Sequence, residues 1–173
     1  DELTAWKDKL EHIFVWEYAL NYDNYFDFYP NLKDFQQNLK FLKDHGVDGV
    51  FINGSESYSA LQDIKCATTA RLLKDPDLKL NKILTEEFNA RYPKEVAKIT
   101  SEFYRNITEE FSNSTKKMGI YSGINEAYRK YLHPEALESF YQKLKPLASE
   151  SQDFNTQSLL LSVAFLRLEL MRY

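Results

Sequence analysis

The chain has 173 residues, of which 43% are hydrophobic and 28% charged, and its formal net charge is −4. Length and composition are typical of a globular protein with one domain or slightly more. The slightly acidic, mixed charge argues against nucleic acid as a partner, and no apolar run reaches the roughly 18 residues of a membrane span.

The residues that usually bind metals are few and scattered. The single cysteine, Cys66, excludes an internal disulfide and a cysteine-based metal site, and the three histidines lie far apart in the chain. We therefore expect neither a metal nor a cofactor. The chain begins with Asp1 and carries no signal peptide, so we expect it to be a piece of a longer polypeptide.

The first part of the chain predicts one β–α–β unit. Residues 13–20 (IFVWEYAL) are rich in β-branched and aromatic side chains and predict a buried strand. Asn31 is a good helix N-cap and Gly46 a good C-cap for the helix that follows. That helix shows one apolar face, formed by Leu32, Phe35, Leu39 and Leu42. Residues 47–54 return to strand character, and a right-handed crossover makes the two strands parallel.

From residue 55 onward the sequence predicts only helices. One ends near Pro76, another before Pro93, and Pro134 opens a further one. The last helix, residues 155–173, is apolar almost all round, so we expect it to be central and mostly buried. The tyrosines of this half are interpreted as packing residues; they include Tyr121, Tyr128, Tyr131 and Tyr141. We divide the chain into an α/β segment, residues 1–75, and a C-terminal helical domain, residues 76–173.

Two parallel strands cannot form a stable sheet alone, because both edges would be unpaired and both faces need cover. The predicted fold class is therefore α/β followed by mainly α. The β–α–β unit would be the terminal part of a (β/α)₈-type barrel, followed by a C-terminal helical bundle. The rest of a longer polypeptide would supply the further strands.

Several short sequence segments, in this order and spacing, resemble those of a known family. They are Trp16–Glu17–Tyr18 with Asn21, Pro30–Asn31–Leu32, Gly46–Val47–Asp48–Gly49, residues 72–77, and Glu87–Phe88 with Tyr92. The chain resembles bacterial proteins labelled as a domain of unknown function, which are glycoside-hydrolase-like and similar in pattern to α-glucuronidases. The resemblance implies a barrel, a carbohydrate partner and a periplasmic or secreted bacterial location.

Barrel active sites lie at the carboxyl ends of strands, here residues 17–29 and 53–58. Glu17 is the candidate catalytic carboxylate. The candidate substrate-binding residues combine stacking rings with paired amide groups, and they are Trp16, Tyr18, Asn21, Tyr22 and Asn53. Strand alternation puts Glu17 on the face opposite Trp16 and Tyr18. Relatives often carry an acidic residue or Gln where this chain has Ile52–Asn53, which weakens the case for catalysis from the second strand.

Each candidate has a structural alternative. Glu17 could pair with a Lys or Arg, and the Asn- and Asp-rich loop could be a turn that bonds its own backbone. The function predicted is the C-terminal part of a glycoside-hydrolase-like protein that acts on or binds polysaccharide-derived sugars. Whether it is an enzyme stays open, because no second catalytic carboxylate is identified. The alternative is a non-catalytic helical module for protein interaction.

Overall fold

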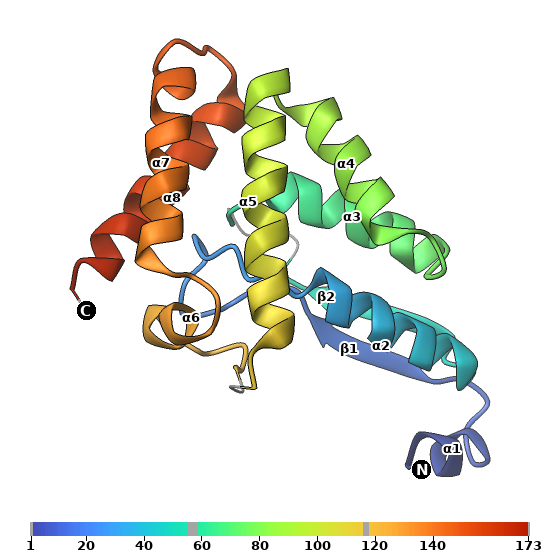
Figure 1. Ribbon diagram of the computed structural model, residues 1–173. Helices are drawn as coiled ribbons and strands as arrows, with labels where there is room; N and C mark the ends of the chain where they lie inside the picture. The colour runs from blue at the N-terminus through green and yellow to red at the C-terminus, as the bar shows by residue number, and fades with distance from the viewer. Residues whose placement is uncertain (1, 55–58, 116–117, 173) are drawn as a thin grey trace.

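The computed structural model describes residues 2–54, 59–115 and 118–172, and Figure 1 shows their arrangement. The elements in chain order are α1 (Glu2–Lys7), β1 (Phe14–Tyr18), α2 (Leu32–Asp44), β2 (Gly49–Asn53), α3 (Gln62–Lys74), α4 (Leu80–Arg91), α5 (Lys94–Asn113), α6 (Ile124–Lys130), α7 (Pro134–Ser149) and α8 (Phe154–Leu170). In Figure 1, α5 stands in the middle, α3 and α4 lie on one side, and α7 and α8 on the other.

The predicted β–α–β unit is confirmed. β1 and β2 pair in parallel, with a register that runs from Phe14 opposite Gly49 to Tyr18 opposite Asn53. Gly46 follows α2 with a φ of +68°, the left-handed conformation that glycine adopts without strain. Asn31 stands at the N-cap as predicted, although its side chain makes no capping hydrogen bond.

α2 covers one face of the two strands. The four residues of its predicted apolar face are all buried. Phe35 and Leu39 join Leu72 of α3 and Ile83 of α4 in one cluster, and Val50 and Ile52 of β2 pack against it. The apolar face of α2 thus forms a layer of side chains between the sheet and the helical half.

The main core lies in the helical half and takes in the loop after β1. The rings of Phe103 in α5 and Phe140 in α7 stack with centroids 4.3 Å apart and planes at 4°. Phe28, from the loop between β1 and α2, meets both rings edge-on at 5.3 and 6.4 Å. Phe28 is fully buried, so the loop that carries the predicted site is held by the helical core. The division into residues 1–75 and 76–173 stays a prediction.

The last helix differs from its prediction. α8 buries one side against its neighbours through Leu159, Val163 and Leu166, and it packs mainly on α7. Its opposite side leaves large apolar side chains exposed, at 77% for Phe154, 63% for Leu161, 37% for Phe165 and 64% for Leu168. The expectation of a central helix was wrong because an apolar stretch does not reveal how many neighbours surround it.

The layout of α/β followed by α agrees with the predicted fold class at this level. Across the described ranges the protein has two strands and eight helices, and they form no barrel. In the same ranges, none of the helices combines the length and apolar character needed to cross a membrane.

Candidate functional site

The two faces of the sheet differ in what covers them. Paired residues of parallel strands point to the same side, so Trp16 and Phe51 share a face with Tyr18 and Asn53. This open face stays accessible: Trp16 is 56% exposed and Phe51 55%. Phe14 lies across Gly49 on the same face, where an added Cβ would stand 2.8 Å from its ring.

A row of aromatic rings runs from the open face past the carboxyl end of β1. Ring centroids are 4.4 Å apart between Phe51 and Trp16 and 6.4 Å between Trp16 and Tyr18. Tyr22 then follows Tyr18 at 5.7 Å and meets Tyr121 at 5.8 Å. We call these five residues the aromatic row. They form a continuous line of ring faces and edges, four of them well exposed.

Tyr121 is a member of the row that sequence reasoning misplaced. It was expected to be a packing residue, and at 68% exposed it is not. Tyr128 is exposed as well, whereas Tyr131 is fully buried and fits its prediction. Tyr121 reaches the row because the backbone N–H of Tyr22 donates to the carbonyl of Ile120 at 2.7 Å. Such a pairing between residues 98 positions apart leaves no local pattern in the sequence.

Tyr22 lies in the loop after β1 and is in contact with three other tyrosines. Besides Tyr18 and Tyr121 it also meets Tyr25, with centroids 6.2 Å apart. Desolvation by burial, followed by the neighbouring tyrosines, raises the pKa of the Tyr22 hydroxyl. This hydroxyl is buried and, in the described structure, has no hydrogen-bond partner. It is therefore a polar atom at the row for which the described residues supply no acceptor or donor.

Glu17 lies on the other face of β1, toward α2. Asn38 of α2 donates from Nδ2 to Glu17 Oε1 at 3.4 Å. No ion pair of Glu17 occurs among the described residues, so the predicted alternative of a Lys or Arg partner is not what the structure shows there. The structure thus separates Glu17 from Trp16 and Asn53, as strand alternation predicts.

A polar hollow of about 580 Å³ opens beside Glu17. Asp34 and Asn38 of α2 line it together with Tyr18, the residue that also belongs to the aromatic row. Lys130 of α6 lines it as well, and burial lowers the pKa of this lysine while Asp34 partly offsets the effect. Asp34 was not predicted as a site residue, since in the sequence it reads as an acidic residue in the first turn of a helix.

Asn21 belongs to the interior. It is 1% exposed, and its Nδ2 donates to Asp27 Oδ2 at 3.0 Å and to the Ser122 carbonyl. Its Oδ1 accepts from the backbone N–H of Asp23 at 3.2 Å. Every polar atom of this side chain is engaged in bracing the loop, so Asn21 does not face the aromatic row's surface. In the structure this side chain braces the loop, and its contact with substrate stays a prediction.

Asp27 is the hub of this bracing network. It accepts from Asn21, from the hydroxyl of Tyr131 and from the backbone N–H of Tyr29 at 3.2 Å. The buried amine of Lys65 lies near it without a hydrogen-bond partner among the described residues. Desolvation lowers the pKa of Lys65 to about 8, although Asp27 acts to raise it. The loop after β1 is thus anchored through charge as well as packing.

The second predicted strand end is only partly described. Asn53 is half-buried, and its carbonyl accepts from the backbone N–H of Ala19 at 3.0 Å. Residues 55–58 of the predicted segment 53–58 lie outside the described residues. In the described ranges, no group of three or more His, Cys, Asp or Glu side chains could hold a metal ion.

Comparison with known proteins gives one match. A family model described as a domain of unknown function, DUF4838, matches residues 1–105. This range covers both strands, the loop between β1 and α2, and most of α5. No curated protein and no solved structure matches the chain.

Proposed function

Because the chain belongs to the domain of unknown function family DUF4838, whose description states no activity, we propose a function from its own side chains. The protein binds polysaccharide-derived sugars at the carboxyl ends of β1 and β2. It does so as the C-terminal part of a glycoside-hydrolase-like protein whose remaining strands complete a (β/α)₈-type barrel, with α2 on the outside and the open face, which carries the aromatic row, lining the inside at the mouth of the barrel. A bacterial periplasmic or secreted location belongs to the same proposal.

The aromatic row carries this proposal. Large apolar rings are normally buried, and an exposed group of them marks a binding surface. The apolar faces of a pyranose pack on aromatic rings, and at its loop end the row adds the hydroxyl groups of the exposed Tyr18 and Tyr121. Tyr18 joins the row to the hollow of Glu17 and Asp34, where carboxylate oxygens can accept bonds from sugar hydroxyls.

Beyond binding, the protein also hydrolyses the sugar chain it binds. Glycoside cleavage uses two carboxyl groups on either side of the scissile bond. Glu17 remains the proposed catalytic group, and Asp34 lines the same hollow as a second carboxylate. Glu17 faces α2 rather than the open face, so a sugar would have to bind around the end of β1, past Tyr18, for Glu17 to reach it.

The two tryptophans of the chain offer a matched test. Trp6 in α1 is 57% exposed and Trp16 is 56% exposed, so truncating either removes a similar amount of surface. Binding to a panel of plant and bacterial oligosaccharides is measured by calorimetry for the Trp16→Ala and Trp6→Ala variants. We expect Trp16→Ala to weaken binding roughly tenfold and Trp6→Ala to leave it unchanged. Equal effects, or no binding by the unaltered protein to any member of the panel, would refute the proposal.

A second candidate is the non-catalytic interaction module, and α8 is the feature that favours it. The exposed side of α8 places Leu161, Phe165 and Leu168 at i, i+4 and i+7, the spacing of a helix face that packs on another surface. Replacing Leu161 and Leu168 by Ser and measuring self-association by sedimentation separates the two functions. This double variant should retain sugar binding if the aromatic row is the site.

A further inference from the structure

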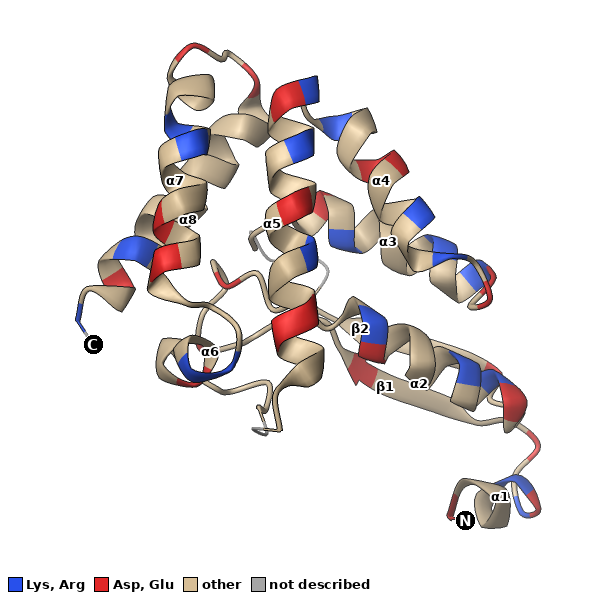
Figure 2. Ribbon diagram, viewed as in Figure 1, with Lys and Arg blue, Asp and Glu red and all other residues tan. Residues whose placement is uncertain are grey.

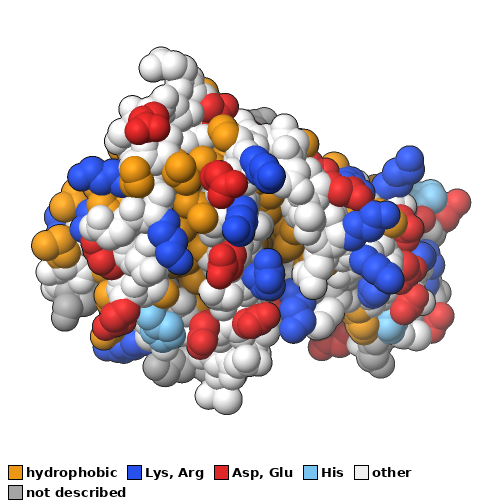
Figure 3. Space-filling model, turned by 45° about the horizontal axis from the view of Figure 1, so that its top comes forward, with side chains coloured by type: hydrophobic (Ala, Val, Ile, Leu, Met, Phe, Trp, Pro, Cys, Tyr) orange, Lys and Arg blue, Asp and Glu red, His pale blue; other side chains and the backbone are white. Residues whose placement is uncertain are grey.

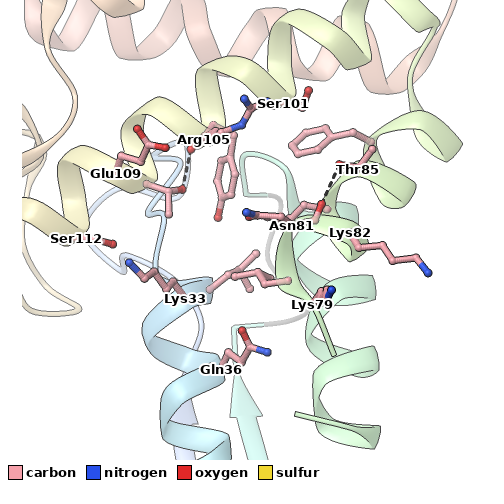
Figure 4. A pocket seen from close by; sticks show the side chains of 16 residues that line it. Lys33, Gln36, Lys79, Asn81, Lys82, Thr85, Ser101, Arg105, Glu109 and Ser112 are labelled. Atoms are coloured by element: carbon pink, nitrogen blue, oxygen red, sulfur yellow. Dashed lines mark hydrogen bonds between the residues drawn. The ribbon is translucent and has the colours of Figure 1, made fainter. Parts of the chain in front are cut away.

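A second hollow lies between α2, α4 and α5, and it shares no lining residue with the hollow beside Glu17. Its volume is about 800 Å³, within the range of pockets that hold small molecules. Leu32, Leu84 and Phe88 supply an apolar part of its wall. Figure 4 shows the polar residues that surround this space, which come from all three helices. We call it the α2–α4–α5 cleft.

The cleft is rich in unpaired positive charge, although the whole chain has a net charge of −4. Lys33, Lys79 and Arg105 line it and are exposed, and no ion pair of any of them occurs in the described ranges. By contrast, Arg71 outside the cleft contacts Glu86 at 2.7 Å and Glu87 at 3.1 Å. The lining itself includes one acidic residue, Glu109.

The charges come together only in space. Figure 2 shows blue positions on each of α2, α4 and α5, interspersed with red ones. On the face shown in Figure 3, Lys and Arg side chains lie near the middle of the molecule together with Asp and Glu side chains, beside a recess in which apolar side chains are visible. Cations around an apolar wall suit an organic anion, because its charged head can contact the cations while its apolar body packs on the wall.

Besides the side-chain cations, the start of α4 adds positive charge to the cleft. The first turn of α4, from Leu80, lines the cleft, contains no acidic residue and has no side-chain cap at Lys79. The unpaired backbone N–H groups of a helix start carry partial positive charge and bind anions. Figure 4 shows the side chain of Asn81 directed toward the middle of the cleft, whereas Lys82 points away from it.

Tyr104 extends the apolar wall of the cleft. It lines the cleft and is 2% exposed, and its ring centroid lies 6.1 Å from that of Phe88. Its hydroxyl is closed off from solvent, and burial, followed by Asp27, raises the pKa of that group, so the hydroxyl belongs to the interior. The ring of Tyr104 and the ring of Phe88 therefore form one apolar surface below the cations.

We propose that the α2–α4–α5 cleft binds a small organic anion, with its phosphate or carboxylate head toward the cations that line the cleft and its apolar body against Leu84 and Phe88. The site does not depend on sugar binding at the strand ends, which uses other residues.

The proposal is tested by calorimetry on the 173-residue chain with simple probes. Phenyl phosphate and benzoate each combine an anionic head with an apolar ring, inorganic phosphate has the head alone, and phenol has the ring alone. We expect phenyl phosphate or benzoate to bind more tightly than inorganic phosphate and phenol, and the stronger of the two identifies the head group. Raising the salt concentration should weaken this binding. Binding of phenol as tight as that of both anions, or no binding of either anion at millimolar concentration, overturns the proposal.

Two variants connect the binding to the cleft. Arg105→Gln removes an exposed cation and should weaken binding about tenfold, the effect of one charge-assisted hydrogen bond. Lys79→Gln removes a second exposed cation of the lining and should also weaken binding about tenfold without lowering the melting temperature. Lys143→Gln, an equal change of charge at an exposed position of α7, is the control and should have no effect. If both cleft variants bind like the control, the site is not this cleft.

Discussion

Trp16 and Phe51 lie opposite each other across the two parallel strands, with ring centroids 4.4 Å apart, and each stays more than half exposed. A cross-strand aromatic pair of this kind usually stabilises a sheet by packing beneath another layer. Here the described residues place no layer above it, while α2 covers the opposite face. The pair is therefore available as a surface, and it begins the aromatic row on which the proposed sugar binding depends.

The two tryptophans allow binding to be followed optically. In the Trp6→Phe variant, Trp16 is the remaining tryptophan of the chain, so the emission reports the aromatic row alone. A sugar stacked on Trp16 removes water from the indole, and we expect a blue shift of emission that saturates with ligand concentration. The Trp16→Phe variant, which reports from Trp6, should show no shift. A saturable shift in this second variant would place the sugar elsewhere.

Glu17→Gln tests the catalytic candidate separately from its structural contact. The amide keeps the shape and the hydrogen bond with Asn38 while removing the charge. We expect Glu17→Gln to abolish turnover by the longer parent polypeptide and to weaken sugar binding by less than about tenfold. Asn38→Ala, which removes only the neighbour, should leave turnover within a small factor. Unchanged binding and turnover in Glu17→Gln would exclude Glu17 from the site.

The buried amine of Lys65 predicts a stability that rises with pH. Its pKa is about 8 in the folded protein and about 10.4 in an unfolded chain. Between these values the unfolded state holds more protons, so the free energy of unfolding increases as pH rises. We expect the unaltered protein to gain about 2 kcal/mol relative to a Lys65 variant between pH 7 and 9.5, measured by urea denaturation. The comparison removes the opposite contribution of Cys66, because burial raises the pKa of its thiol.

Lys65→Met supplies the control for this pH dependence, because methionine has a similar length and no charge. The variant should lose the rise with pH. Measurements stop below pH 10, since burial also raises the pKa of Tyr104 and Tyr131, whose ionisation in the unfolded state then lowers stability. A slope in Lys65→Met equal to that of the unaltered protein would show that another group causes it.

Asp27→Asn should destabilise the protein by roughly 2–4 kcal/mol. The carboxylate accepts bonds from Asn21, Tyr131 and the backbone of Tyr29 at a position 2% exposed, and an amide cannot accept them all. Asp23→Asn, an exposed change four residues earlier in the same loop, should cost less than about 0.5 kcal/mol. Similar melting temperatures for the two variants would contradict the role of Asp27 as a hub.

The two sides of α8 should respond differently to truncation. Leu166 is fully buried and Leu168 is 64% exposed, although both belong to the same apolar stretch. Leu166→Ala should cost roughly 2–5 kcal/mol of unfolding free energy, and Leu168→Ala less than about 0.5 kcal/mol. Guanidinium denaturation of the two variants provides the comparison. A large cost for Leu168→Ala in a monomer would mean that its side chain is buried in solution.

The sequence by itself determined the β–α–β unit, the apolar face of α2 and the opposition of Glu17 to Trp16. These features depend on residues close together in the chain: alternation within a strand, a 3.6-residue period within a helix, and Gly46 at a helix end. The same local rules located the helix that opens with Pro134. They also placed Trp16, Tyr18 and Tyr22 near one another, because the three lie within one strand and the loop that continues it.

Only the tertiary structure decided which face of β1 stays open, which side of α8 is covered, and what Asn21 contacts. Each depends on how separate elements pack against one another: α2 on the sheet, α7 on α8, and Ser122 with Asp27 around Asn21. The cleft lined by Lys33, Lys79 and Arg105 joins three helices in the same way. Burial and charge depend on all the neighbours of a residue in space, and a single sequence specifies those neighbours only through the complete fold.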